Sequence, residues 1–146
     1  MARPKQPRVQ ILAEVAAPRG LGPRELADCI VRAWAAYDGP PGAAVDVVLL
    51  GEAEHTRLHF QLLGDPEPTD VMAVAYRDPD LWGEILVNVD CALRVGAERG
   101  HGAAAECRLY VTHGALHLLG FADGNERAAA AMRAAEMQIA GVRGGE

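Results

Sequence analysis

Two histidines stand four residues apart in the segment Thr112-His113-Gly114-Ala115-Leu116-His117-Leu118-Leu119-Gly120-Phe121-Ala122-Asp123. On a helix this spacing places both side chains on one face, about 5–6 Å apart at Cβ, and two imidazoles can then bind one ion with Zn–N bonds of about 2.0–2.1 Å. Gly120 predicts the end of the helix, because glycine readily adopts the left-handed conformation that stops it. Asp123 can supply a third ligand, and two nitrogens with one carboxylate leave a position open for water, as in catalytic zinc sites.

The same residues also have purely structural interpretations. A histidine pair on a helix rich in alanine and leucine also suits a surface or a hydrogen-bonded core, and Asp123 lies in Ala122-Asp123-Gly124-Asn125, a typical turn sequence. Zinc peptidases carry a glutamate directly after the first histidine, whereas this chain has Gly114 there. A peptidase is therefore disfavoured, and the sequence identifies no general base.

Length and composition predict a single domain over residues 1–146, with enough chain for a hydrophobic core. Hydrophobic residues make up 50% of the chain and charged residues 23%, which favours a globular protein over a disordered one. The formal net charge of −6 argues against a nonspecific nucleic-acid binder. A local basic patch that binds RNA is still compatible with that total.

The three cysteines, Cys29, Cys91 and Cys107, show no Cys-x-x-Cys spacing. We expect buried thiols with no disulfide partner, as is typical of a reducing compartment. No stretch approaches the roughly 20 apolar residues of a membrane span, and the apolar run after the basic start is too short for a targeting signal. These features predict a cytoplasmic protein with no membrane partner.

Hydrophobic periodicity and turn residues predict four strands and five helices in the order β-α-β-α-β-β-α-α-α. The expected strands are Arg8–Ala16, Val45–Leu50, Thr69–Tyr76 and Trp82–Val89. The expected helices are Pro23–Tyr37, Glu52–Leu63, Cys91–Glu98, Ala103–Leu119 and a last helix that Asn125 caps and Gly141 ends.

Three local features refine this assignment. The almost continuous apolar run Val45–Leu50 is typical of a central strand covered on both faces, and the last two strands are close enough in sequence for an antiparallel hairpin. Asp90 is expected to cap the helix that begins at Cys91. The helix Glu52–Leu63 is expected to pack through its leucines, Leu58, Leu62 and Leu63.

The histidine segment resembles the signature His-Gly-x-Leu-His-Leu-x-Gly-Tyr/Phe of the YbeY family, the bacterial metal-dependent endoribonucleases of ribosomal RNA maturation. Thr69-Asp70-Val71-Met72 and Trp82–Asp90 resemble two further family motifs, so that the similarity extends over about Gly51–Gly120. The resemblance implies an α+β domain, in which a layer of helices covers a four-stranded mixed sheet and the metal-binding helix lies near the C-terminus.

The chain departs from the family in its metal ligands. The family has three metal-binding histidines, and Asp123 stands in the position of the third. We expect His113, His117 and Asp123 to bind the metal, since a carboxylate oxygen is a zinc ligand at about 2.0–2.2 Å. The expected cofactor is one Zn²⁺ per chain, although the same ligand set suits other divalent transition metals.

A second departure is Leu63, which replaces a family arginine thought to be important for catalysis. An arginine offers a planar fork to a phosphate, and its loss removes a stabiliser of the charge that develops in phosphoryl transfer. Three other residues are expected to have no catalytic role. These are Arg57, a solvated surface charge; His59, a partly exposed helix histidine in the family's asparagine position; and His101, a reserve metal ligand on a surface loop.

The resemblance implies a metal-dependent endoribonuclease that acts on ribosomal RNA precursors and has the ribosomal subunit as a partner. The sequence does not identify the catalytic residues of this enzyme. Thr69 and Asp70 are expected at the entry of a strand, and the alternative is that they border the cleft. A non-catalytic ribosome-assembly module that keeps the fold and metal is a competing hypothesis, which Leu63 favours. A metal hydrolase with a different small substrate is a third, suggested by the acidic balance.

Overall fold

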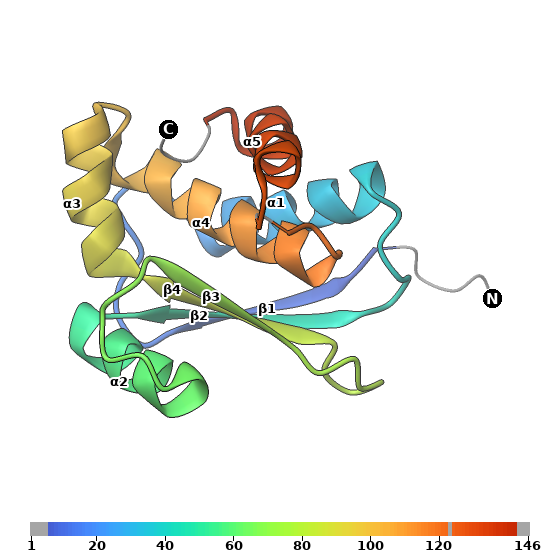
Figure 1. Cartoon of the computed structure of the whole chain (residues 1–146), viewed down its shortest axis with the longest axis horizontal. Coiled ribbons are helices and arrows are strands. Elements are labelled where there is room, and N and C mark those ends of the chain that lie inside the picture. Colours follow the sequence, from blue (N-terminus) through green and yellow to red (C-terminus); the bar gives the residue numbers. More distant parts are fainter. Residues whose placement is uncertain (1–5, 123, 143–146) are drawn as a thin grey trace.

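The computed structural model describes residues 6–122 and 124–142 as one four-stranded sheet with helices on both faces (Figure 1). Its strands are β1 (Arg8–Ala13), β2 (Ala44–Leu50), β3 (Val71–Ala75) and β4 (Gly83–Asn88). Its helices are α1 (Pro23–Ala36), α2 (Glu52–Leu63), α3 (Val89–Arg99), α4 (Gly102–Leu118) and α5 (Glu126–Ala140). The predicted order of elements is confirmed.

The sheet is mixed, as expected. Its strands lie in the order β1-β2-β4-β3, where β1, β2 and β4 are parallel and β3 pairs antiparallel with β4. The predicted hairpin is therefore present, and β2 is a central strand. Strand β1 ends three residues earlier than expected, because the amides of Glu14 and Val15 both donate to the carbonyl of Leu49 and so leave the regular ladder.

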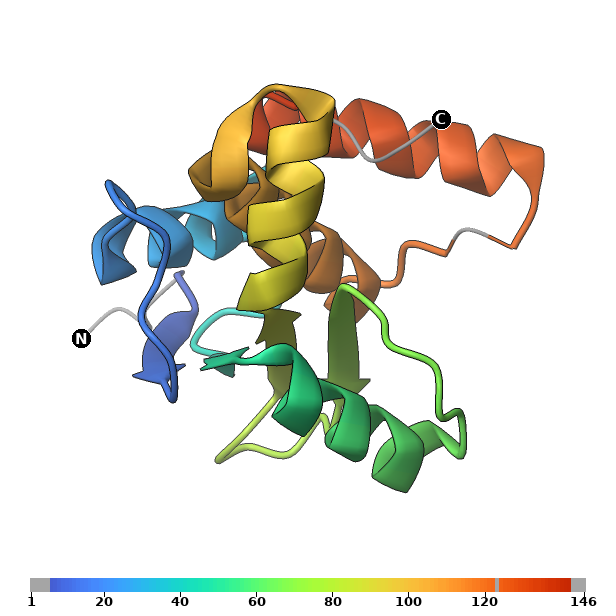
Figure 2. The ribbon, with the colours of Figure 1, turned by 90° about the vertical axis from the view of Figure 1, so that its left-hand side faces the viewer.

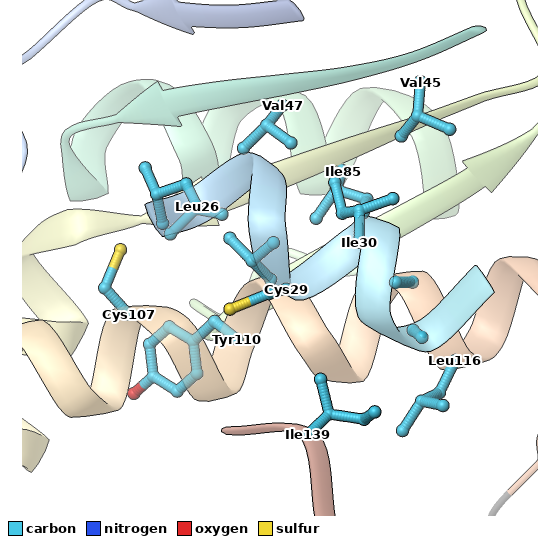
Figure 3. Close-up of a cluster of buried hydrophobic side chains, with 14 of the residues drawn as sticks. Leu26, Cys29, Ile30, Val45, Val47, Ile85, Cys107, Tyr110, Leu116 and Ile139 are labelled. Atoms are coloured by element: carbon cyan, nitrogen blue, oxygen red, sulfur yellow. The ribbon is translucent and has the colours of Figure 1, made fainter. Parts of the chain in front are cut away.

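The helices divide unequally between the two faces of the sheet. Helices α1 and α4 cover one face, α3 and α5 pack on that side, and α2 lies alone on the opposite face (Figures 1 and 2). In the main core Leu26 and Ile30 of α1 pack among Val45 and Val47 of β2 and Leu116 of α4, all fully buried (Figure 3). Each such side chain stabilises the fold by about 1.5–3 kcal/mol relative to leaving it exposed.

Helix α2 packs differently from the prediction. Its buried side chains are His55 and His59, whereas Leu62 and Leu63 are 48% and 67% exposed. Leu58 alone of the three leucines packs on the sheet, in a small cluster with side chains of the outer face. The expectation of three leucine anchors is therefore wrong, because Leu62 and Leu63, at the end of the helix, remain exposed.

The buried side chain of Asn88 joins the beginnings of three elements. Its Oδ1 accepts from the amide of Cys91 at 3.0 Å and so caps α3, while its Nδ2 donates to the carbonyl of Thr69 at 3.0 Å and to Glu52 at 3.2 Å. The expectation that Asp90 caps this helix is wrong, since the helix begins one residue earlier than Asp90. The Asp90 carboxylate instead accepts from the amide of Glu52 at 2.8 Å, the first residue of α2.

The three cysteines are buried free thiols, as expected. Burial raises the pKa of the Cys107 thiol to about 12. Across residues 6–122 and 124–142, no helix is both long enough and apolar enough to cross a bilayer.

Candidate metal centre

Helix α4 presents the two histidines from the centre of the domain, and Gly114 permits its position there. A Cβ atom on Gly114 would lie 2.6 Å from Cγ2 of Ile85, which is fully buried in β4. Only a residue without a side chain allows the helix to approach the sheet this closely. The Gly that replaces the glutamate of zinc peptidases is therefore explained by helix–sheet packing.

The imidazoles of His113 and His117 converge. Their Nε2 atoms lie 3.0 Å apart, with ring centroids 4.5 Å apart and ring planes at 75°. Two nitrogens bound to one tetrahedral zinc at about 2.0–2.1 Å lie about 3.3 Å from each other. The pair therefore fits a single divalent ion with little movement, and the prediction that α4 brings the two side chains together is confirmed.

A carboxylate that the sequence did not identify lies behind this pair. Oε2 of Glu136, on α5, is 2.5 Å from Nδ1 of His113, and the Glu136 residue is only 2% exposed. A carboxylate on the second ring nitrogen fixes the orientation of a metal-binding histidine and raises its basicity. The sequence feature that could have identified Glu136 is that it is a charged residue within the apolar stripe of α5. It follows Ala135 and lies one turn from Met132 and Ile139, and all of these residues are buried.

The predicted third ligand, Asp123, lies outside the described residues, and its role stays a prediction. The chain before it ends α4 as expected: Gly120 has a φ of 100°, and the amide of Phe121 donates to the carbonyl of Leu116 at 2.9 Å. In the part of the chain that the structure describes, no three His, Cys, Asp or Glu side chains form a metal-binding group.

Two surface depressions adjoin at His113. The first, of about 430 Å³, lies between α2, β3 and α4 and is lined by residues that include His59, Leu63 and His117. The second, of about 500 Å³, lies between β3, α4 and α5. Thr69 lines both depressions together with His113, so His113 is open to a ligand from either side, whereas His117 lines the first depression alone.

The expectations for the residues of α2 are confirmed only in part. Arg57 is an exposed surface charge, as expected, and its guanidinium donates to Glu54 and Gln61. Leu63 stands at the mouth of the first depression with its side chain largely in solvent. His59 is buried and not partly exposed as expected: its Nδ1 lies 2.7 Å from the carbonyl of Glu67, which ties α2 to the loop that follows.

His101 has a structural partner, which the sequence did not indicate. It is the residue that precedes α4, and its Nε2 lies 2.5 Å from Oε1 of Glu106, which is fully buried. The same carboxylate accepts from Nη1 of Arg99 at 2.8 Å. A buried carboxylate is tolerated when such partners satisfy it, so His101 serves the α3–α4 junction and does not line either depression.

Thr69 and Asp70 have both of the roles considered for them. They precede the first residue of β3, and Oδ1 of Asp70 accepts from the amide of Val71 at 2.7 Å. Both also line the second depression. The border position is therefore confirmed together with the position at the strand entry.

Comparisons with known proteins agree with this arrangement. The family described as Endoribonuclease YbeY matches residues 24–142. The chain is 35% identical over 124 residues to Endoribonuclease YbeY of Moorella thermoacetica, covering 75% of this chain and 80% of that relative. It is 34% identical over 92 residues to Endoribonuclease YbeY of Kineococcus radiotolerans, covering 56% and 53% of the two chains.

A solved structure shares the fold. The solution structure of TM1509 from Thermotoga maritima superposes with a TM-score of 0.61 at 26% identity, covering 91% of this chain and 89% of that chain. The family match extends over more than half of the chain and includes the histidine segment. The chain therefore belongs to the endoribonuclease YbeY family.

Proposed function

We propose that this protein is a metal-dependent endoribonuclease that cleaves ribosomal RNA precursors, with the ribosomal subunit as its partner. The observation that carries the proposal is the convergence of the Nε2 atoms of His113 and His117 where two open depressions adjoin. Membership in an endoribonuclease family supports RNA as the substrate class. The cytoplasm is the compartment that this role implies.

The residues present fit a bound divalent metal. His113 and His117 would hold it, with Asp123 as the proposed third ligand and one Zn²⁺ or related transition-metal ion per chain. When bound, such a metal polarises a phosphate oxygen or lowers the pKa of a water molecule. The protein itself keeps His113 oriented through Glu136 and exposes the pair to a strand that runs along the depressions.

The experiment combines metal content with cleavage. Purified wild-type protein is expected to carry about one divalent metal per chain, measured by inductively coupled plasma mass spectrometry, and to cleave RNA until a chelator is added. The double variant His113→Ala/His117→Ala should lose both properties. Arg57→Ala, which removes a charge that lines neither depression, is the control. Unchanged metal occupancy in the double variant would contradict the proposed site.

One observation favours a second candidate function. Leu63 is exposed at the mouth of the first depression, where a family arginine would meet a phosphate. A non-catalytic assembly module would keep the fold and the metal, bind the ribosomal subunit and leave RNA intact. Folded, metal-loaded protein that binds subunits without any cleavage would identify this function. Turnover of a small phosphodiester without turnover of RNA would instead identify a hydrolase with a small substrate.

A further inference from the structure

The second depression contains the cationic side chains that the first one lacks. No lysine or arginine among the described residues lines the first depression. The second depression, of about 500 Å³, is lined by both Arg99 and Arg133. Because the two depressions share His113 and Thr69, a strand that passes the histidine pair meets, among the described residues that line them, arginine side chains on the side of the second depression.

Arg133 is available to bind a ligand. It lies in the middle of α5 with its side chain half-buried, and it makes no hydrogen bond or ion pair with residues 6–122 or 124–142. Glu136, one turn later on the same helix, has its carboxylate on His113. An arginine that is partly desolvated and unmatched by a carboxylate binds anions better than a fully solvated one.

Arg99, at the end of α3, lines the same depression. Its Nη1 donates to the buried Glu106, which fixes the guanidinium while leaving other N–H groups for a ligand. Two carboxylates also line this depression, and both already accept hydrogen bonds within the protein. Asp70 accepts from the amide of Val71, and Glu136 is bonded to His113.

We infer that Arg133, with Arg99 in the same depression, binds a phosphate of the RNA strand next to the bond that is cleaved. This inference rests on the proposed function. It assigns to α5 the phosphate binding that α2 loses where Leu63 replaces the family arginine. A guanidinium is suited to the task because its planar fork matches two oxygens of a phosphate. The bound strand then lies across His113 and extends into the second depression.

The test measures RNA binding separately from cleavage. Fluorescence anisotropy with a labelled single-stranded RNA gives the dissociation constant over a range of salt concentrations. It is recorded with the protein as purified and again with chelator, which prevents cleavage. The variants are Arg133→Gln and its matched control Arg127→Gln, which removes the same charge from an exposed position of α5 that lines neither depression.

Arg133→Gln is expected to weaken binding several-fold and to reduce the slope of log K against log[salt] by about 0.7, the value for one phosphate contact to a single strand. Arg127→Gln should leave the slope unchanged, and Arg133→Lys should restore most of it. Arg133→Met, which keeps the apolar stem of the side chain, serves if the glutamine variant melts early. It should show the same loss of slope.

Two results would overturn the inference, and only the second of them would also overturn the proposed function. Equal binding and equal slopes for Arg133→Gln and Arg127→Gln, in a protein that cleaves RNA, would remove the inference and leave the proposed function intact. Wild-type protein that neither binds nor cleaves RNA would remove both.

Discussion

Oε2 of Glu136 lies 2.5 Å from Nδ1 of His113, so helix α5 orients a histidine carried by α4. Replacing the carboxylate by an amide keeps its shape and removes its charge, and the histidine then becomes a weaker ligand. We expect Glu136→Gln to lower metal affinity about 10–100-fold, the range for such outer partners. Competition with a chromophoric chelator measures this affinity. Glu126→Gln, at the exposed start of α5, is the control, and equal affinities would remove Glu136 from the metal site.

Asp123 can be tested by two opposite substitutions. If its carboxylate is the third ligand, Asp123→Ala should lose most of the metal affinity, because only two protein ligands remain. Asp123→His should preserve or tighten binding, because it restores the three histidines of the family. The chelator competition assay compares all three proteins. Wild-type affinity in Asp123→Ala would mean that this residue serves only the turn.

Leu63→Arg tests whether the lost arginine limits catalysis. Removing one preorganised electrostatic donor typically costs about 10²–10³ in rate, so restoring it should raise RNA cleavage towards that extent. The substitution should be tolerated, because Leu63 is 67% exposed and its replacement buries no charge. Single-turnover cleavage assays measure the gain. A folded, metal-loaded variant with no gain would show that position 63 does not limit the rate.

Gly114→Ala tests why glycine follows the first histidine. The new methyl group would lie 2.6 Å from Cγ2 of Ile85, a branch too close to the backbone to move away. Overpacking of this kind costs about 1–3 kcal/mol, so urea unfolding should show a corresponding loss of stability. Gly124→Ala, where an added Cβ meets no atom within 4 Å, should change stability little. Equal stability in the two variants would contradict the packing explanation.

His55 should make the fold sensitive to acid. Burial lowers its pKa, while its Nε2 lies 2.8 Å from the carbonyl of Leu86. Because the unfolded chain takes up this proton near pH 6.5 and the folded one does so only at lower pH, stability should fall as the pH drops below about 6.5. Urea unfolding at pH 7.5 and 5.5 measures the loss, which should be smaller in His55→Gln. An identical pH dependence in the variant would exclude His55 as the cause.

The sequence predicts most of the fold because the periodicity of its apolar residues follows the faces that are buried. Leu26 and Ile30 lie one helical turn apart on α1, and Val47 belongs to the apolar run of β2. All three lie in the core. Leu62 and Leu63 break this correspondence. They continue the apolar pattern to the end of α2, where their side chains are exposed, and no local signal in the sequence marks this change.

The candidate site was predictable only where its residues are neighbours in sequence. His113 and His117 share one helix, so their spacing alone brings them together. Glu136 and Arg133 reach the same place from another helix, and that requires knowledge of how α5 packs on α4. His101 and Glu106 are close in sequence, but their pairing depends on the turn between α3 and α4.

The amide of Asn88 has a consequence for the shape of the first depression, although it lines neither depression. By holding Thr69 and Glu52 together, it sets how far strand β3 stands from helix α2. Thr69 lies at the border of both depressions, and Leu63 stands at the far end of α2. The distance between the α2 side and the β3 side of the first depression is thus determined by Asn88, a buried residue that does not line the depression. A change at position 88 is therefore expected to alter the width of this depression while leaving the histidine pair of α4 in place.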